Sequence, residues 1–551
     1  MQIVIPMSGY GERFRAAGYK IPKPLIVVEG KPIIAHVIDM FPGEKNFIFI
    51  CNQDHLDNGA YEMKNILKKY CPSGIIIGIS SHKLGPIHAV LQAKHLIDFN
   101  EPTIVNYCDF TCYWDWYHFK NIMSDTSCDG AVPAYKGFHP HTLGTTNYAY
   151  MREAKGFLLD IQEKQPFTNN RMNEFASSGT YFFKTGKLML DAFSETIKNN
   201  INVNGEFYVS LAYKALLKNN NKVVVYPLQY FMQWGTPQDV QEYNYWSNVF
   251  KRLLELKIFS NKSYGSVIIP MAGLGQRFID EDYKEVKPLI LVSGKPMVIQ
   301  AVNDLPNSDH QVFVLREDMP NVEGIMARLS NTYNQPIIKC TPKVTEGQAC
   351  SALFGLDALE EAIKGFVGPV TFSACDNGVI YNHEVFDSLM NDDGIDIIIW
   401  GIKGYANAIR HPKMYGWINE NHGKVSDILV KTTPISTQDQ PIIIGTFTFK
   451  KASDFRISVE SLFNRNGRIN NEFYIDSAIN DAIQLGLKCH YFEVDSFISW
   501  GTPNDLKTFE YWQSCFSKWP QHPYKLELDQ RISKQQIQDI RDKYKDIQPA
   551  L

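Results

Sequence analysis

Two glycine-rich segments place bare backbone beside basic side chains, a combination that suits the binding of a polyphosphate. In the first segment Gly9 and Gly11 precede Arg13, and Lys23 follows in a Lys-Pro-Leu triplet. Glycine lets backbone N–H groups approach phosphate oxygens, and the N-terminus of a following helix favours anions. A single glycine pair would indicate only a tight turn. The second segment repeats the same residue types at Gly273, Gly275, Arg277 and Lys287, and this repetition favours a phosphate site in both places.

The glycine segments are 264 residues apart, and other segments recur in the same order 266 or 267 residues apart. They are Cys108-Asp109 with Cys375-Asp376, residues 179–183 with 445–449, Glu206-Phe207-Tyr208 with Glu472-Phe473-Tyr474, and residues 234–237 with 500–503. A solenoid unit would recur every ~20–50 residues, so this spacing predicts two copies of a whole domain. We expect domain 1 at residues 1–258, domain 2 at residues 264–520, and a charged, helix-prone C-terminal tail at residues 521–551.

Short apolar runs alternate with helix-like stretches in each copy. Residues 47–50 and 75–77 are unbroken β-branched or aromatic runs, which predict strands covered on both faces. Residues 88–97 have helical spacing, and residues 266–270 are expected to form the first strand of the second copy. The alternation predicts an α/β fold with a mainly parallel, mixed sheet flanked by helices. Each glycine segment then follows a first strand, where open α/β sheets bind ligands.

The overall composition narrows the class of protein. A chain of 551 residues is too long for one hydrophobic core, and 44% hydrophobic with 21% charged residues is ordinary for a globular protein. The net charge of −4 argues against nucleic-acid binding. No apolar run approaches the ~20 residues of a membrane span, and no signal-peptide pattern is recognised. The ten cysteines show neither a disulfide framework nor zinc spacing. We therefore expect a cytoplasmic protein with no nucleic-acid or membrane partner, and leave a homo-oligomer open.

The repeated motifs resemble those of a known family. Gly-x-Gly-x-Arg, Lys-Pro-Leu and then Gly30-Lys31-Pro32 or Gly294-Lys295-Pro296 look like the signature of sugar-1-phosphate nucleotidylyltransferases, also called NDP-sugar pyrophosphorylases. The wider group includes phosphocholine cytidylyltransferases. The resemblance covers nearly all of both halves and implies two tandem Rossmann-like (GT-A-like) domains. It also implies Mg²⁺-dependent attack of an acceptor phosphate oxygen on the α-phosphorus of an NTP, with pyrophosphate leaving.

The resemblance assigns catalytic and metal-binding roles. Arg13 and Arg277 would neutralise the pyrophosphate, since arginine is always charged and binds two oxygens at once; Lys23 and Lys287 would lie on the α-phosphate. Asp109 and Asp376 would hold Mg²⁺, which usually takes one or two carboxylates together with substrate phosphates.

The chain departs from the family at a second metal-binding position. Many members have a second aspartate where this chain has Gln233 and Ser499. Either the second metal ligand is absent, or another acid replaces it, with Asp115 or Asp495 as candidates.

The remaining site residues are implied in the same way. Nucleotide contacts are expected from Met7, Ser8, Gly9, Gly11 and Gly85 in the first copy, and from Met271, Ala272, Gly273, Gly275, Gly347 and Gln348 in the second. Acceptor contacts are expected from Glu163, Lys164, Gly179 and Glu206, and from Lys431, Gly445 and Glu472. Pro86 stands where the second copy has Gln348, and Val430 stands where the first has Glu163. The copies are therefore predicted to be two related but diverged sites.

Three alternatives remain beside a nucleotidylyltransferase that acts on a sugar phosphate, with one activity per domain and a role in supplying surface polysaccharide. The first is a phosphocholine-type cytidylyltransferase, whose acceptor is a small alcohol phosphate. In the second, one domain is catalytic and the other only regulatory or binding. The third, a dinucleotide-dependent oxidoreductase, is disfavoured because the third glycine of the dinucleotide fingerprint is absent.

Overall fold

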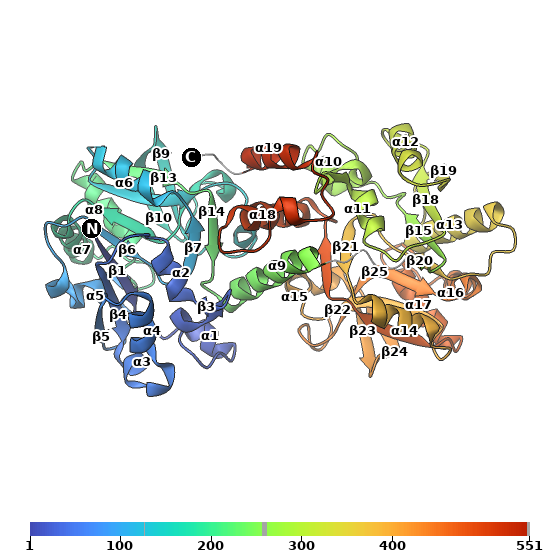
Figure 1. Ribbon diagram of the computed structural model, residues 1–551, viewed down its shortest axis with the longest axis horizontal. Coiled ribbons are helices and arrows are strands. Elements are labelled where there is room, and N and C mark those ends of the chain that lie inside the picture. The colour runs from blue at the N-terminus through green and yellow to red at the C-terminus, as the bar shows by residue number, and fades with distance from the viewer. Residues whose placement is uncertain (126, 256–261, 548–551) are drawn as a thin grey trace. The chain divides into compact units, whose positions relative to one another are not determined.

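The computed structural model describes residues 1–125, 127–255 and 262–547. The chain divides into two compact units, each a β-sheet flanked by helices (Figure 1). Unit 1 comprises Met1–Ser247, Tyr511–Pro523 and Arg541–Leu551, and unit 2 comprises Asn248–Glu510 and Tyr524–Ile540. The predicted end of domain 1 at residue 258 lies outside the described residues. The predicted domain limits at residues 258, 264 and 520 stay predictions.

Unit 1 is built on a ten-stranded mixed sheet. Its strands, in spatial order, are β11 (Phe175–Ser177), β9 (Ala149–Ala154), β10 (Phe157–Glu163), β13 (Val223–Pro227), β8 (Gly130–Tyr135), β12 (Thr180–Phe183), β6 (Thr103–Asn106), β1 (Gln2–Met7), β4 (Phe47–Asn52) and β5 (Ile75–Ile79). Pairing is parallel among β6, β1, β4 and β5 and between β8 and β13, and antiparallel elsewhere. The parallel half is therefore the one that carries the glycine segment after β1.

Unit 2 repeats this succession in a nine-stranded sheet. Its strands, in spatial order, are β19 (Ile337–Thr341), β18 (His310–Arg316), β15 (Ser266–Pro270), β20 (Val370–Phe372), β25 (Ile442–Phe449), β22 (Ile397–Ile402), β26 (Cys489–Glu493), β24 (Lys424–Val430) and β23 (Gly416–Asn421). One long strand, β25, takes the place of β12 and β11. The prediction of a strand at residues 266–270 is confirmed by β15.

The burial of each strand agrees with its place in the sheet. All six residues of β4 are buried, as expected of a central strand. The prediction that residues 75–77 are covered on both faces is wrong, because β5 is the edge strand and Ile75 is 43% exposed. Helices α5 (Pro86–Gln92), α7 (Gly186–Lys198) and α8 (Ala212–Lys218) contribute buried side chains to the same core as β1 and β4. The helix predicted at residues 88–97 ends earlier, at Gln92, and a 3-10 turn follows at Lys94–Leu96.

The other helices lie between strands or after the sheets. In the first half they are α1 (Glu12–Ala16), α2 (Ile33–Asp39), α3 (Gln53–Asp57), α4 (Met63–Tyr70), α6 (Trp116–Asp125) and α9 (Pro237–Glu255). In the second half they are α10 (Gln276–Asp280), α11 (Met297–Asn303), α12 (Val322–Thr332), α13 (Gln348–Ala362), α14 (His383–Asn391), α15 (Ala406–Arg410), α16 (Ala452–Asn464), α17 (Ile475–Gln484), α18 (Pro503–Lys518) and α19 (Ile537–Ile547). Among the residues that the structure describes, none of these helices has the length and apolar character needed to cross a bilayer.

Short two-stranded ribbons complete the fold and carry residues of the sites. The pairs are β2 (Val27–Val28) with β3 (Lys31–Pro32), β7 (Phe110–Tyr113) with β14 (Tyr230–Gln233), β16 (Leu291–Val292) with β17 (Lys295–Pro296), and β21 (Asn377–Ile380) with β27 (Ser496–Ser499). β7 begins one residue after Asp109, and β21 begins one residue after Asp376. The β7–β14 and β21–β27 ribbons therefore fix the loops that hold Asp109 and Asp376.

Candidate active site

The predicted phosphate-binding residues of unit 1 line one cavity of about 370 Å³. Its walls include Met7, Ser8, Gly9, Gly11, Lys23, Gly85, Asp109 and Glu206, all singled out from the sequence, together with Tyr107 and Tyr208. The side chain of Arg13 does not line it, although the Arg13 charge lies close enough to oppose that of Lys23. Residues from five separate segments thus converge at the end of β1, as the α/β pattern predicts.

A matching cavity of about 430 Å³ lies in unit 2. Met271, Gly273, Gly275, Lys287, Gln348 and Asp376 line it, whereas Gly347, Lys431, Gly445 and Glu472 do not. Leu274, Phe278 and Ile279 give this cavity an apolar flank, where the first has Tyr10, Glu12 and Lys83. The two sites therefore differ in their surroundings as well as at Gln348.

The glycine at the start of each first helix brings the lysine into the site. Gly11 has φ 66° and ψ 44°, a left-handed conformation, and a Cβ on it would lie 3.5 Å from Lys23 Cβ. Gly275 has φ 67°, and its Cβ would lie 3.3 Å from Lys287 Cβ. Helices α1 and α10 have only five residues each, so their dipoles are small and the lysine and arginine supply most of the positive charge.

Each lysine is paired with the aspartate that was predicted to bind metal. Lys23 Nζ lies 2.8 Å from Asp109 Oδ2, and Lys287 Nζ lies 2.5 Å from Asp376 Oδ2. All four side chains are between 21% and 24% exposed, so a ligand can reach them. Burial is the largest single effect and lowers the pKa of Lys23, but the charge and hydrogen bond of Asp109, together with Cys108, outweigh it, so the pKa is raised overall. Lys287 behaves in the same way beside Asp376, so both lysines remain cations at neutral pH.

The residues around each aspartate are compatible with Mg²⁺. A Cβ on Gly235 would lie 3.1 Å from Asp109 Oδ2 and 2.7 Å from the Gln233 amide nitrogen, so Gln233 and Asp109 flank the same glycine. A Cβ on Gly501 would likewise lie 3.2 Å from Asp376 Oδ2 and 3.6 Å from Ser499 Oγ. Carboxylate, amide and hydroxyl oxygens are the hard ligands that Mg²⁺ accepts. In the described part of the chain no three His, Cys, Asp or Glu side chains gather as a ready-made metal site, so substrate phosphates would have to complete the coordination.

The two acids suggested as replacements for the second metal ligand lie elsewhere. Asp115 accepts a hydrogen bond from the His118 backbone N–H at 2.9 Å, and Asp495 forms an ion pair with Arg252 at 3.3 Å. Neither lines its unit's nucleotide cavity. That suggestion is therefore wrong, because both carboxylates already serve other partners.

The acceptor residues of unit 1 form a connected polar group beside the cavity. Lys164 Nζ donates to the hydroxyl of Tyr208 and lies 4.4 Å from the centre of its ring, and the Tyr208 hydroxyl donates to Glu206 Oε2 at 2.6 Å. Glu163, at the end of β10, accepts from Ser210 Oγ at 2.6 Å, and burial raises the pKa of Glu163 to about 7. This group can present a cation and two carboxyl groups to a phosphorylated, hydroxylated molecule.

Gly179 has a packing role in the same region. It has φ 97°, its carbonyl accepts from the Tyr107 N–H at 3.0 Å, and a Cβ would lie 3.0 Å from the Phe110 ring. Gly445 also has a positive φ, 76°, but its Cβ would meet no atom nearer than Ala374 Cβ at 3.9 Å. Glycine at residue 179 is therefore required both by the backbone and by the aromatic ring beside it.

In unit 2 a half-buried carboxylate in the corresponding region comes from a different element. Val430 holds the place of Glu163 and is buried, as the sequence indicates. Asp476, in the first turn of α17, is the counterpart of Ser210; burial raises its pKa, and the nearby Lys431 charge opposes the shift. Lys431 Nζ donates to the Met414 carbonyl at 2.6 Å and lies 5.5 Å from the centre of the Tyr474 ring. The loss of an acid inferred from Val430 is therefore compensated by Asp476.

Sequence reasoning missed one pair of supporting residues. Asn52 Nδ2, at the end of β4, donates to the Ser8 carbonyl at 3.1 Å, and Arg316 Nη1, at the end of β18, donates to the Ala272 carbonyl at 2.8 Å. Both side chains are buried and both fix the glycine segment from the neighbouring strand. The available signal was a polar residue at the end of an otherwise buried strand.

The geometry places a cavity with a glycine segment and a lysine–aspartate pair in each unit, and comparison with known proteins gives the family of the first. Residues 3–247 match the family model described as nucleotidyl transferase. The chain is 28% identical over 212 residues to the bifunctional protein GlmU of Burkholderia orbicola strain AU 1054, covering 38% of this chain and 43% of that protein. It is 26% identical over 192 residues to the mannose-1-phosphate guanylyltransferase catalytic subunit beta of Xenopus tropicalis, covering 34% of this chain and 51% of that protein.

Among solved structures, a nucleoside-diphosphate-sugar pyrophosphorylase from Vibrio cholerae RC9 is similar, with a TM-score of 0.37 and 20% identity over 44% of this chain and 99% of that one. The chain spans about half the length of the curated relatives that it matches. Residues 3–247 therefore form a domain of the nucleotidyl transferase family, and the relatives that the chain matches include a mannose-1-phosphate guanylyltransferase subunit. The family predicted from the sequence is thereby confirmed, and with it an enzyme of the nucleotidyltransferase class.

Proposed function

We propose that this enzyme transfers a nucleoside monophosphate from an NTP to a sugar phosphate in a Mg²⁺-dependent reaction that releases pyrophosphate. The observation that carries the proposal is the unit 1 cavity, where the glycine segment, the Lys23–Asp109 pair and the Glu206–Tyr208 acceptor group meet. Nucleotidyl transfer requires mainly positioning and charge stabilisation. A cavity with cations, a hard-metal carboxylate and an adjoining polar group meets that requirement.

The position of each residue in unit 1 suggests its role in the proposed reaction. Asp109, with Gln233 beside it, would hold Mg²⁺, which neutralises charge on the phosphates when bound. Lys23, released from Asp109 Oδ2, would contact the α-phosphate, and Arg13 would neutralise the departing pyrophosphate. Lys164 would orient the acceptor phosphate for attack.

We infer a second site of the same kind in unit 2. The Lys287–Asp376 pair and the glycine at residue 275 support it, because both repeat the geometry of unit 1. Gln348 and the apolar flank around Leu274 support a different base or acceptor there. Two activities on one chain would suit the supply of cytoplasmic precursors for surface polysaccharides, a pathway that the family resemblance suggests.

The test is a pyrophosphate-release assay of the full chain with each of the common NTPs against a panel of acceptors. The panel holds several sugar 1-phosphates and phosphocholine, each with Mg²⁺ and with excess EDTA. We expect EDTA-sensitive release with at least one sugar phosphate. Release with phosphocholine alone would assign the chain to the cytidylyltransferase alternative. No release with any pair would contradict the proposed reaction.

A further inference from the structure

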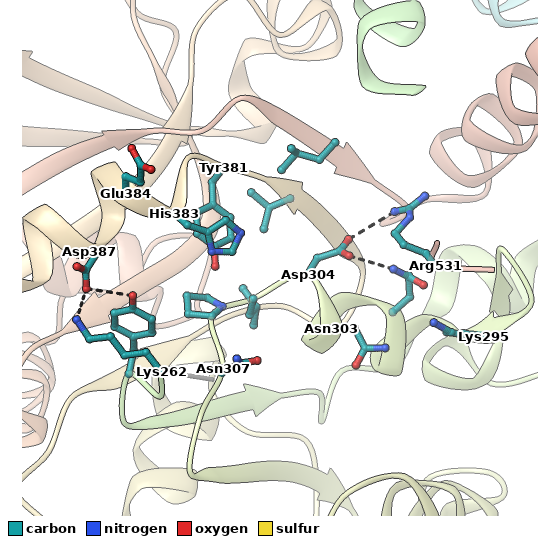
Figure 2. Close-up of a pocket in the computed structure, with 16 residues that line it drawn as sticks. Lys262, Lys295, Asn303, Asp304, Asn307, Tyr381, His383, Glu384, Asp387 and Arg531 are labelled. Carbon is teal, nitrogen blue, oxygen red and sulfur yellow. Dashed lines mark hydrogen bonds and ion pairs between the residues drawn. The ribbon is translucent and has the colours of Figure 1, made fainter. Parts of the chain in front are cut away.

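Unit 2 contains a second cavity, of about 460 Å³, that shares none of its described lining residues with the nucleotide cavity (Figure 2). Its walls come from the end of α11 and the residues after it, from β21 and the start of α14, and from Arg531 in the segment Tyr524–Ile540. Figure 2 shows Asp304 and Arg531 at one end and the contacts of Asp387 with Lys262 and Tyr264 at the other. We call it the Asp304–Arg531 cavity.

The charged end of this cavity contains buried polar atoms that have no hydrogen-bond partner. Arg531 Nη1 and Asp304 Oδ2 lie 3.8 Å apart, too far for a hydrogen bond, and the two side chains are only 9% and 7% exposed. Gln300 Nε2 donates a hydrogen bond to Asp304 Oδ1 at 3.0 Å. The other amide atom, Gln300 Oε1, takes no part in this bond. Within the described residues, Asp304 Oδ2, Arg531 Nη1, Gln300 Oε1 and the Tyr381 hydroxyl are buried with no hydrogen-bond partner. Such atoms are rare in folded proteins, and a group of them around one cavity calls for partners that an ordered water or a bound ligand can supply.

Two cations face the same end. In the part of the chain that the structure describes, Lys295 makes no hydrogen bond or ion pair, and it lies on the Arg531 side of the cavity (Figure 2). Burial and the Arg531 charge lower the pKa of Lys295, and the charges of Asp304 and Asp529 oppose that shift only in part. Arginine and lysine together are a usual partner for phosphate or carboxylate. An anionic group placed between them would relieve their repulsion.

The fold does not require these charges. In unit 1 the place of Asp304 is taken by Met40, which is 4% exposed, and the place of Gln300 is taken by His36. His36 is satisfied by the Val28 carbonyl at 2.8 Å and by Gln521 Oε1 at 3.2 Å. The same turn of the fold is thus built without a buried carboxylate.

A purely structural ion pair is the competing explanation. It would hold the segment Tyr524–Ile540 in place through Arg531. However, the shorter contacts of Arg531 go to Asp529 Oδ1, at 3.3 Å from Nε, and to Asp529 Oδ2, at 3.4 Å from Nη2. Asp304 is therefore the weaker partner, and a buried ion pair with imperfect geometry stabilises little.

We propose that the Asp304–Arg531 cavity is a binding site for a small hydroxylated anion of the sugar-phosphate class, separate from the nucleotide site. Arg531 and Lys295 bind the anionic group, and Asp304 and Gln300 Oε1 accept hydrogen bonds from hydroxyl groups of the ligand. The buried Tyr381 hydroxyl offers a further partner near the middle of the cavity. The volume of about 460 Å³ lies in the range of small-molecule sites.

The test uses the full chain with glucose 1-phosphate, inorganic phosphate or glucose, followed by hydrogen exchange and mass spectrometry. We expect glucose 1-phosphate to protect peptides covering residues 297–307, 377–387 and 524–540. Asp304→Met, which introduces the residue of the other unit, should weaken that response by about tenfold or more, as should Lys295→Met. The Lys295 side chain makes no hydrogen bond or ion pair within the described residues, so its variant remains informative if the first does not fold.

The matched control is Lys431→Met, which alters the acceptor group of the same unit and should leave this protection unchanged. Phosphate or glucose alone should act at least about tenfold more weakly than glucose 1-phosphate, because each offers only half of the recognised groups. The proposal is overturned by an absence of protection, by equal responses to phosphate and glucose 1-phosphate, or by wild-type affinity in the Asp304→Met and Lys295→Met variants. Loss of protection in Lys431→Met would place the ligand in the acceptor group instead.

Discussion

Gly85 lies where the part of the unit 1 cavity expected to bind the base meets the part expected to bind the acceptor. Replacing Gly85 with alanine should disturb both parts. Gly85 has φ 88° and ψ 174°, a region that is essentially open only to glycine. A Cβ there would lie 2.6 Å from the backbone nitrogen of Phe207 and 2.8 Å from its carbonyl oxygen. Phe207 bridges the loop, since its N–H donates to the Leu84 carbonyl at 2.9 Å and its carbonyl accepts from the Ile87 N–H at 3.2 Å. The added methyl group therefore meets backbone atoms that cannot rotate away.

The expected cost follows from these two effects. The backbone strain is worth about 1–3 kcal/mol, and overpacking against backbone is worth a further ~1–3 kcal/mol. A destabilisation on the order of 3 kcal/mol would lower the melting temperature of a unit of this size by roughly 6–12 °C. Gly347→Ala should behave similarly in unit 2, where a Cβ would lie 2.5 Å from both Phe473 N and Phe473 O.

Scanning calorimetry of Gly85→Ala checks this expectation, with Gly9→Ala as the matched control. Gly9 belongs to the same cavity, has no positive φ, and has no atom within 4 Å of its added Cβ. We expect the control to change stability by no more than ~0.5 kcal/mol. If Gly85→Ala melts like the control, the close approach of Phe207 to the loop is not a feature of the folded protein.

Three further predictions concern Glu163, Asp476 and Arg465. Because burial raises the pKa of Glu163 to about 7, above its unfolded value, its contribution to stability is fully present below about pH 4.5 and is lost as the pH rises through about 7. The melting temperature of the wild type should therefore fall relative to Glu163→Gln between about pH 5 and pH 8, and parallel pH profiles would contradict the burial argument. Asp476→Ser should raise the acceptor KM of the proposed unit 2 activity by about tenfold and leave the unit 1 activity unchanged, as steady-state kinetics with each site's substrates would show; equal KM values would remove Asp476 from the acceptor group. Arg465→Met removes the charged partner of Asp481, which is 0% exposed, accepts from Arg465 Nε and Nη2 at 2.7 Å each and keeps, among the described residues, only the Ser461 hydroxyl at 3.1 Å; because Arg465 is 47% exposed, urea unfolding should show a loss of about 1–3 kcal/mol, and no measurable loss would mean that water solvates the carboxylate.

The duplicated fold could be read from the sequence because its signals are local. The strand at residues 266–270 is recognised by an apolar run, and β15 confirms it. The family resemblance assigned Lys23 and Asp109 to one site, and the structure pairs them beside the parallel strands β1 and β6. These features depend on short-range patterns and on the general rules of sheet topology.

Features that depend on contacts between distant elements were not predictable. The exchange of Glu163 for Asp476 involves a strand in one copy and a helix in the other, so aligning the copies shows only the lost acid at Val430. β5 is an edge strand because only β4 pairs with it in the described sheet. Its apolar run resembles that of a central strand, so the sequence does not show this. The contact of Arg531 with Asp304 joins segments more than 200 residues apart in the chain, and no spacing in the sequence marks it.

The central claim is that each unit holds its own nucleotidyl-transfer site around an aspartate. It is tested most directly by pyrophosphate release from Asp109→Ala, Asp376→Ala and the double variant, with Asp115→Asn as a control carboxylate outside the cavity. If each unit holds its own site, each single variant should lose one activity by at least about 100-fold. The control should keep both activities, and the double variant should release no pyrophosphate. Release by the double variant at the wild-type rate would contradict the claim.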